Sequence, residues 1–474
     1  MRLLNQVLEL LSARYLGGIP VDRVATVVAV LFSYLLAHAF QRIPARLAPV
    51  RHLFSVLSTV VLFGFVQEQY LGLLHMAVGA TVVYVLMRCV QGARMPQAVF
   101  LATMLHMSYS HIRRQMGEAR SGRMALDYTG AQMVFVVKAT SLAFCIDDGR
   151  KLDSGTLSSY QRRNAIVGVP GLLEYLGYVF FFPGFSVGPA FEMATYRRMV
   201  ALDDSRAKSQ LSGRAYRKLL EGIFWMVVYI VYGTEYTFAA MAQRQFYTHR
   251  SFVSAAMSLC VAGVMARAPY YTAWKMSEGA CILAGLGYDG YGKDGKVRWM
   301  DIANVHVRGM ELGTSLRELI DSWNIGTNTW LRHHVYLRIN GSRTRATVLT
   351  FLVSAWWHGF YAGYYLTFVL AALAASAARI LRRNLNPIVR VAAGGPVTFR
   401  RRATKAVYDG AGWALSKYTL DFVAAPFMLL SLHASLRIWY YNLFAVPLGV
   451  ACIFLAFNVL GVGRFLPVVG PVDG

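Results

Sequence analysis

Charged side chains are scarce in this sequence. Only 15% of its 474 residues are Asp, Glu, Lys or Arg, whereas an ordinary soluble domain carries about a quarter. Long apolar runs recur along the chain, and together with the missing charge they argue against a soluble globular protein. The sequence therefore predicts a protein that crosses a membrane several times.

Acidic residues are scarcer than basic ones. The chain has 24 Asp and Glu against 48 Lys and Arg, a formal net charge of +24. Such an excess in a soluble protein would indicate nucleic-acid binding, but here the basic residues mostly lie between apolar runs. That pattern is typical of short cytoplasmic loops in contact with anionic lipid headgroups. We expect membrane lipids as partners and no nucleic acid, and an anionic coenzyme A thioester would suit the same loops.

Cysteine is also rare, and none of the five has CxxC or zinc-finger spacing. An odd, scattered set argues against a disulfide framework, and we expect no metal site. At the N-terminus, MRLLNQVLELLSARYLGG lacks a clear small-residue cleavage site. It is expected to form an interfacial amphipathic helix rather than a signal peptide.

The apolar segments predict an all-α polytopic fold. They lie near 24–40, 52–67, 70–90, 98–110, 130–147, 171–192, 220–243, 252–266, 346–377, 418–436 and 439–462. Several are shorter than the roughly 20 residues of a perpendicular span, as in re-entrant or broken helices. We expect about ten or eleven transmembrane or re-entrant helices around an internal tunnel, in a single membrane domain over 1–474. Within it, the basic stretch 379–417 is expected to be a cytosolic loop with room for a short amphipathic helix.

Two short motifs suggest enzymes of other classes. Residues 184–188 match G-x-S-x-G, but that motif needs a strand-to-helix elbow, and Ser186 lies in an apolar helix broken at Pro183 and Pro189. Residues 285–290 match G-x-G-x-x-G, but a polar turn follows where a dinucleotide site requires a helix. We interpret the first as a helix break and the second as a glycine-rich helix exit.

One histidine lies in an unusual setting. His358 belongs to SAWWHGFYAGYYLTF at 354–368, which is otherwise almost entirely aromatic, aliphatic or glycine. A charged group at membrane depth costs on the order of 2.5 kcal/mol or more, so such residues usually mark function. Neutral imidazole is cheaper to bury and suits general base catalysis. Gly359 leaves room beside it, and Trp357 and Tyr365 belong to the aromatic residues that would line a tunnel; a packed helix contact is the alternative.

Several motifs together resemble the membrane-bound O-acyltransferase family, and its lysophospholipid acyltransferase branch most of all. They are LDYTGAQM at 126–133, FFFPGFSVGPAFEMATY at 180–196, YYTAWKMSEGACILAGLGYDG at 270–290, SWNIGTNTWLRHHVYLR at 322–338 and the WHG of 357–359. They follow the family's order and cover most of the chain from about 105 to 370. One departure is Ala362, where the branch usually has proline.

The resemblance implies a catalytic pair, His358 and Asn324. His358 would take the proton from a glycerol hydroxyl as that oxygen attacks the thioester of acyl-CoA. Asn324 would either orient the hydroxyl or donate a hydrogen bond to the oxyanion, which is worth about 3 kcal/mol. Acyl-CoA would be a co-substrate, and no cofactor is expected.

Further residues are expected to shape the substrate site: Trp323, Asn328, Trp330, Arg332 and Glu278. Arg332 either meets a phosphate or is a snorkelling or loop arginine. Glu278, in an otherwise apolar helix, either pairs with a basic residue or lines the cavity. His333 and His334 are left out because the family pattern does not require them.

The resulting expectation is transfer of an acyl chain from acyl-CoA to a lysophospholipid, in the endoplasmic reticulum. Within the family, the alternatives are a diacylglycerol or sterol acyltransferase and a protein acyltransferase. Neutral-lipid members tend to carry FYxDWWN, whereas this chain has LIDSWNIGTNTW. Outside it, the alternative is a transporter that uses His358 as a proton relay.

Overall fold

The computed structural model describes residues 2–15, 20–121, 127–389 and 399–462, and these residues are mostly helical. The first part of the chain forms α1 (Arg2–Tyr15), α2 (Val21–Arg42), η1 (Ala45–Leu47), α3 (Ala48–Thr59), η2 (Val60–Val66), α4 (Tyr70–Cys89), α5 (Arg94–Ser121) and α6 (Thr129–Gly149). The middle part forms η3 (Leu152–Ser154), α7 (Ser159–Asn164), α8 (Leu172–Val179), η4 (Phe182–Gly184), α9 (Met193–Val200), α10 (Ser205–Lys208), α11 (Leu211–Tyr232), α12 (Phe238–Met241), η5 (Arg244–Tyr247) and α13 (Phe252–Leu283). The last part forms β1 (Tyr288–Tyr291), β2 (Val297–Trp299), α14 (Val307–Leu312), α15 (Leu316–Ser322), α16 (Ile325–Trp330), η6 (Leu331–Val335), η7 (Tyr336–Arg338), α17 (Arg343–His358), α18 (Ala362–Val389), α19 (Phe399–Leu429), α20 (Leu432–Tyr441), α21 (Ala445–Phe454) and η8 (Leu455–Val459).

Six helical stretches of the described chain are long and apolar enough to cross a bilayer, or seven if the bent pair α20–α21 is one span. They are α2, α3 with η2, α4, α6, α13 and most of α18. The prediction of an all-α polytopic membrane protein is confirmed. The other apolar segments counted in the expected ten or eleven lie in helices that are shorter, more polar or broken.

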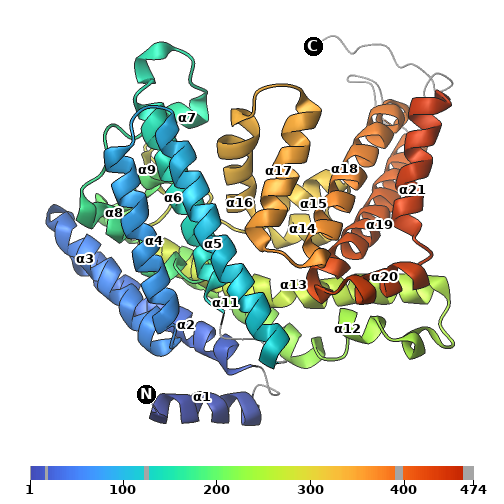
Figure 1. Cartoon of the computed structure of the whole chain (residues 1–474), viewed down its shortest axis with the longest axis horizontal. Helices are drawn as coiled ribbons and strands as arrows, with labels where there is room; N and C mark the ends of the chain where they lie inside the picture. The colour runs from blue at the N-terminus through green and yellow to red at the C-terminus, as the bar shows by residue number, and fades with distance from the viewer. Residues whose placement is uncertain (1, 16–19, 122–126, 390–398, 463–474) are drawn as a thin grey trace.

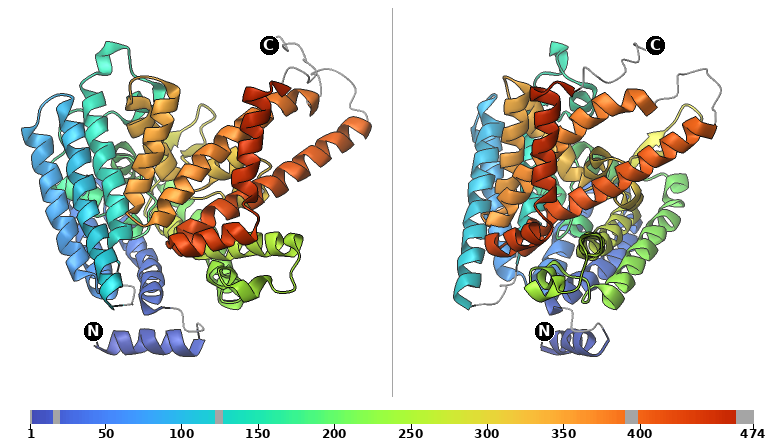
Figure 2. Two further views of the ribbon diagram at one scale, coloured as in Figure 1. Left: turned by 45° about the vertical axis from the view of Figure 1, so that its right-hand side comes forward. Right: turned by 90° about the vertical axis from the view of Figure 1, so that its right-hand side faces the viewer.

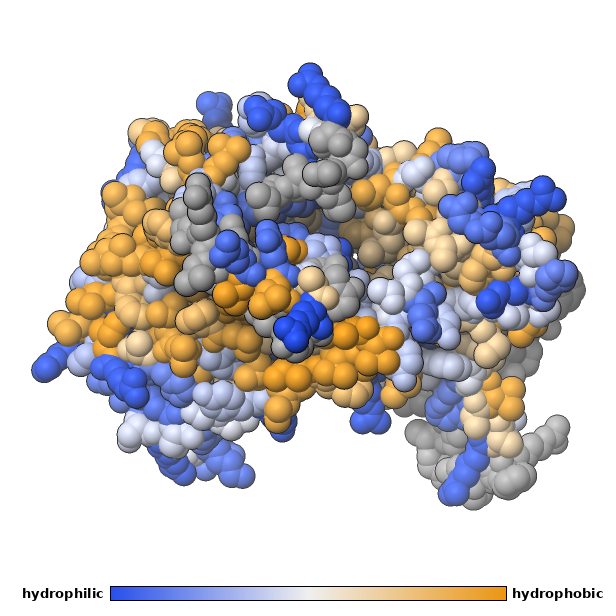
Figure 3. Space-filling model, turned by 90° about the horizontal axis from the view of Figure 1, so that it is seen from below, coloured by the Kyte–Doolittle hydropathy of each residue, from blue (hydrophilic) through white to orange (hydrophobic). Residues whose placement is uncertain are grey.

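The outer helices turn apolar side chains outward. On α4, Leu71, Leu74 and Val78 are exposed, whereas Met76 and Val83 are buried. Exposed leucine and valine at helical spacing would be unfavourable in water, but they match the hydrocarbon of a bilayer. Figure 3 shows broad apolar areas on one face of the molecule, polar areas at its margins, and a hollow between its left-hand and right-hand parts.

Helix α13 connects the two halves of the structure. It packs against α2 and α11 on the side of the early helices and against α19 on the other (Figure 1). Ser251 caps its N-terminus by accepting a hydrogen bond from the backbone N–H of Ser254. Past its end at Leu283, Gly285 and Gly287 adopt φ of 95° and 93°, and the β1–β2 hairpin follows. Residues 285–290 are therefore a helix exit, as the sequence indicates.

A buried charge cluster joins α13, α14 and α19, and we call it the charge quartet. It consists of Arg267, Glu311, Lys417 and Asp421. Arg267 bonds Asp421 and lies 2.9 Å from Glu311, and Lys417 lies 2.5 Å from Glu311 and 3.7 Å from Asp421. Burial acts to raise the pKa of Glu311, but the two cations outweigh it and hold that pKa at about 2. The quartet is thus electrically neutral and fixes α14 in place.

The basic stretch 379–417 is helical over its described part, and this helix is more extensive than the short amphipathic helix for which the sequence leaves room. Residues 379–389 are the end of α18 and residues 399–417 are the start of α19, while 390–398 lie outside the described residues. Lys405 pairs with Asp409 one turn along α19, and Arg402 is exposed. Figure 2 shows these helix ends extending away from α4, α5 and α6. Arginine and lysine are good helix formers, and Arg382 and Arg383 are also exposed on these extensions, whereas Lys417 is buried in the charge quartet. The cytosolic side of the stretch stays a prediction.

Candidate active site

His358 is the last residue of α17. Ser342 caps the start of this helix by accepting from the backbone N–H of Arg345. At the other end, Gly359 has φ of 117°, a conformation that L side chains rarely adopt. Its N–H donates to the carbonyls of Ala355 and Trp356, at 3.2 and 3.1 Å. The helix therefore stops sharply after the histidine, and α18 begins at Ala362.

Aromatic rings surround the half-buried imidazole of His358. Its ring centroid lies 4.7 Å from that of Trp357, 5.6 Å from Tyr364, 5.2 Å from Phe368 and 4.8 Å from Phe427. Over the described chain, no hydrogen bond to another residue occupies either imidazole nitrogen. A nitrogen with no partner in the protein is available to accept a proton from a bound substrate.

Asn324 lies at the start of α16 in the left-handed region, with φ of 45° and ψ of 52°. Asn328 holds the preceding turn, because its Nδ2 donates to the carbonyls of Ile320 and Trp323 at 2.7 Å each. The N–H of Ile325 also donates to the carbonyl of Asn304 at 2.9 Å. Asn328 therefore shapes the turn that presents Asn324, and the strained backbone at Asn324 is held from both sides.

Two tryptophans bring together α16, which Asn324 precedes, and α17, which ends at His358. Trp330 ends α16 and Trp357 precedes His358, and their ring centroids are 6.0 Å apart. The Trp330 Nε1 donates to Thr140 at 2.9 Å, and the Trp357 Nε1 donates to the carbonyl of Met133 at 3.1 Å. Both rings are thus fixed against α6. Among the described residues, no hydrogen bond joins the side chains of Asn324 and His358 directly.

The other residues expected at the site occupy different settings. Trp323 packs against Trp274, with centroids 4.7 Å apart. Glu278 is buried and pairs with Lys275 and Lys218, at 3.0 Å each, which is the first of the two alternatives stated for it. Arg332 is exposed and Tyr365 is half-buried. No hydrogen bond or ion pair engages either of their polar groups within the described chain.

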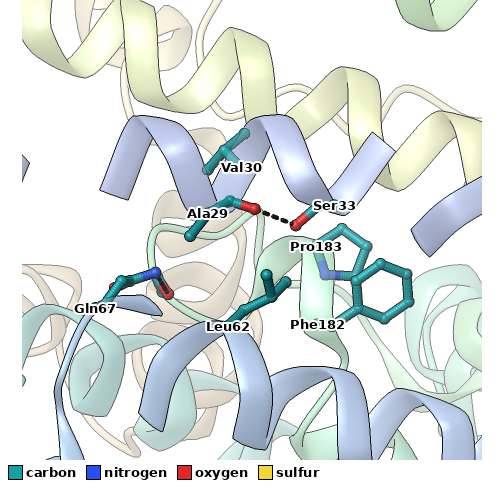
Figure 4. A pocket seen from close by; sticks show the side chains of 8 residues that line it. Ala29, Val30, Ser33, Leu62, Gln67, Phe182 and Pro183 are labelled. Carbon is teal, nitrogen blue, oxygen red and sulfur yellow. Dashed lines mark hydrogen bonds between the residues drawn. The ribbon is translucent and has the colours of Figure 1, made fainter. Parts of the chain in front are cut away.

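Ser186 does not lie in a hydrolase site. It follows the short turn η4, and its hydroxyl accepts from the Nε2 of Gln67 at 3.0 Å. Figure 4 shows the small pocket beside it, with Gln67 on one side and Pro183 and Phe182 on the other. The ring nitrogens of the described histidines do not bond this serine, so it lacks the base that a nucleophile needs.

Sequence reasoning missed a polar cluster behind the site. Glu192 accepts hydrogen bonds from Tyr160 at 2.8 Å, from the Nε2 of His334 at 3.3 Å and from Cys145 at 3.4 Å. One ligand atom each from Cys145, Glu192 and His334 lie within 4.8 Å of one another, so their geometry is compatible with a metal ion. Hydrogen bonds alone account for the arrangement, which anchors η6. In the sequence, the adjacent residues His333 and His334 were the signal that could have indicated this cluster.

Comparison with known proteins gives the family. The profile of the membrane-bound O-acyltransferase family matches residues 76–394. The chain is 32% identical to a lysophospholipid acyltransferase of Schizosaccharomyces pombe over 93% of this chain and 87% of that protein. It is 31% identical to a lysophospholipid acyltransferase of Saccharomyces cerevisiae, over 91% of this chain and 73% of that protein. It is also 31% identical to membrane-bound glycerophospholipid O-acyltransferase 2 of Rattus norvegicus, over 90% of this chain and 83% of that protein.

Proposed function

From the premise that this chain belongs to the membrane-bound O-acyltransferase family, we propose that it transfers a fatty acyl chain from acyl-CoA to the free hydroxyl of a lysophospholipid. The predicted family and enzyme class are confirmed by the family match and the relatives' names. The observation that carries the proposal is the imidazole of His358, which aromatic rings surround and which makes no hydrogen bond to another described residue.

The proposed reaction is a direct transfer with His358 as general base. The imidazole takes the proton of the acceptor hydroxyl while that oxygen attacks the thioester carbonyl. The carbon–oxygen bond of the new ester forms, the carbon–sulfur bond breaks, and the thiolate of CoA leaves and takes up a proton. Asn324, held in its strained turn, either orients the hydroxyl or stabilises the oxyanion. A thioester is already activated, so positioning supplies much of the remaining acceleration.

The substrates proposed fit the surroundings of the site. A lysophospholipid reaches a membrane-buried histidine from the bilayer, and the aromatic residues around His358 suit an acyl chain. Arg332 is exposed and forms no ion pair with any residue of the described ranges, so it is available to a phosphate group. No cofactor is required, because acyl-CoA brings its own leaving group. The chain is a multi-pass membrane protein, and we propose the endoplasmic reticulum as its location.

The test is His358→Ala assayed on purified protein in detergent. Release of free CoA and formation of diacyl phospholipid are measured with a panel of lysophospholipids and mixed acyl-CoAs. Loss of a general base should lower the rate by about 10²-fold or more. His433→Ala, which removes an exposed imidazole from α20, is the matched control and should retain activity.

The same assay decides between the proposal and its rivals. Acylation of diacylglycerol, a sterol or a peptide in preference to every lysophospholipid would indicate another branch of the family. A wild-type protein that releases no CoA with any acceptor would favour the proton-relay transporter. Near-normal turnover by His358→Ala at wild-type expression would remove the histidine from the mechanism.

A further inference from the structure

One face of α5 contacts both sides of His358. His111, Arg114 and Glu118 are spaced at i, i+3 and i+7, which places them on one side of a helix. All three are buried or half-buried, whereas Ile112 and Met116 on other sides of α5 are exposed. We call these three side chains the polar face of α5. Polar groups at this depth require partners, and the partners lie on either side of the histidine.

His111 holds the residue before His358. Its Nε2 lies 3.1 Å from the carbonyl oxygen of Trp357, and since a carbonyl only accepts, this nitrogen is the donor. The carbonyls in the last turn of a helix have no intrahelical donor, so His111 caps the end of α17. The imidazole also lies against Gly359: a Cβ built there would lie 3.2 Å from the ring. Backbone on both sides of His358 therefore rests on one buried side chain.

Glu118 holds the residues after His358. It accepts a hydrogen bond from the hydroxyl of Tyr361, which lies between α17 and α18. Arg114 keeps Glu118 in place with an ion pair of 2.9 Å, and the same guanidinium pairs with Asp127 at 2.5 Å. The turn that carries His358 is thus attached to α5 at Trp357 and again at Tyr361.

We propose that the polar face of α5 positions His358 for catalysis, with His111 and Glu118 as positioning residues that do not touch substrate. This role rests on the proposed function. The α17–α18 turn has few means of staying rigid by itself, because Gly359 is conformationally permissive and Ala362 opens α18 with no fixed φ. Misplacement of a reacting group by about 1 Å can cost around 10²-fold in rate. A positioning role therefore predicts an effect on kcat, whereas loss of a binding contact would change KM.

The first experiment replaces His111. His111→Ala should lower kcat by about 10- to 100-fold, with KM for acyl-CoA and lysophospholipid changed by less than about twofold, because neither substrate loses a contact. His111→Gln keeps a donor near the carbonyl of Trp357 and should recover most of the lost kcat. His106→Ala is the matched control: this imidazole also lies on α5, but its hydrogen bond is to His75 on α4, at 3.2 Å. It should leave kcat near the wild-type value.

The second experiment is needed if His111→Ala does not accumulate as folded protein. Tyr361→Phe removes one oxygen and should also lower kcat at unchanged KM. Adding Ala362→Pro should restore part of that kcat, because proline is favoured at the first helical position and stiffens the turn. Wild-type kcat in both His111→Ala and Tyr361→Phe overturns the proposal. So does a raised KM at unchanged kcat, or a glutamine variant no better than alanine.

Failure of this proposal is distinguishable from failure of the proposed function. If the wild-type protein transfers no acyl group, the function is wrong. If the wild-type protein is active, His358→Ala is inactive and the α5 variants behave like His106→Ala, the function stands and the positioning role falls.

Discussion

The charge quartet should respond to a change in its charge balance more than to the loss of any one hydrogen bond. Asp421 is fully buried and bonds Arg267, and Lys417 lies 3.7 Å away. Asp421→Asn keeps the size of the side chain and removes only the negative charge. Two cations then share the single carboxylate of Glu311, and one positive charge is left uncompensated inside the protein.

The expected cost follows from that uncompensated charge. Breaking a buried ion pair by removing one partner typically costs about 3–5 kcal/mol, much more than the net worth of the pair itself. Arg267 and Lys417 are 7% and 6% exposed, so water can compensate little of the loss. The double variant Asp421→Asn with Lys417→Met returns the cluster to neutrality, leaving Arg267 with Glu311. It should recover most of the lost stability.

Stability is measured as the fraction of each purified variant that stays monodisperse in detergent after heating. For a membrane protein of this size, resistance to heating is a safer basis for comparing variants than an equilibrium free energy of unfolding. The expected order is wild type first, the double variant close behind, and the single variant well below both. A single variant as stable as wild type, or a double variant worse than the single one, would refute the reasoning from charge balance.

Two further predictions concern Ser186 and the basic helix ends. Because the hydroxyl of Ser186 bonds Gln67 and no described histidine, Ser186→Ala should retain most activity, and mass spectrometry should find no acyl-enzyme; an acyl group trapped on Ser186 would contradict direct transfer. If residues 379–417 face the cytosol and attract acyl-CoA, replacing Arg400, Arg401 and Arg402 with Gln should raise KM for acyl-CoA more than KM for lysophospholipid. A membrane-impermeant label placed between 390 and 405 should react from the cytosolic side, and reaction from the lumen would show that the topology is reversed.

Much of the fold could be predicted because bilayer solvation imposes a strong pattern on a sequence. The segments near 24–40, 70–90 and 130–147 correspond to α2, α4 and α6. The proline-broken stretch at 171–192 is α8 followed by the turn η4 and irregular backbone. The extent of helix in the basic stretch 379–417 could not be predicted, because a high density of arginine indicates an interface and is equally compatible with a loop and with an exposed helix.

The site could be predicted only in part, because hydrophobic periodicity shows which face of a helix is buried and does not show which element packs against it. Trp357, Tyr364 and Phe368 are close to His358 in the sequence, and the structure keeps them around it, whereas Phe427 reaches the same imidazole from α19. His111 and Trp357 are 246 residues apart, and Glu278 meets Lys218 across two helices. Such pairings depend on packing, for which one sequence holds no signal. Asn328 illustrates this, since its amide donates to the carbonyls of Ile320 and Trp323; its role at the substrate stays a prediction.

The excess of basic residues has a second explanation beyond cytoplasmic loops. Helices that end inside a membrane protein leave carbonyls without donors, and no water is available at that depth. Long donor side chains supply the missing bonds. Arg51, fully buried, donates to the carbonyls of Val200 and Leu202 past α9, at 2.7 and 3.1 Å.

Side-chain donors also bond carbonyls at three other helix ends. Lys138, also buried, lies 3.4 Å from the carbonyl of Val179 at the end of α8. Gln41 donates to the carbonyl of Ala284 past α13 at 2.6 Å, and His111 does the same for α17. Cations are favoured at helix C-termini by the helix dipole as well. Helices that end inside this fold therefore require internal donors, and the contact of His111 with the turn that carries His358 is one of these cases.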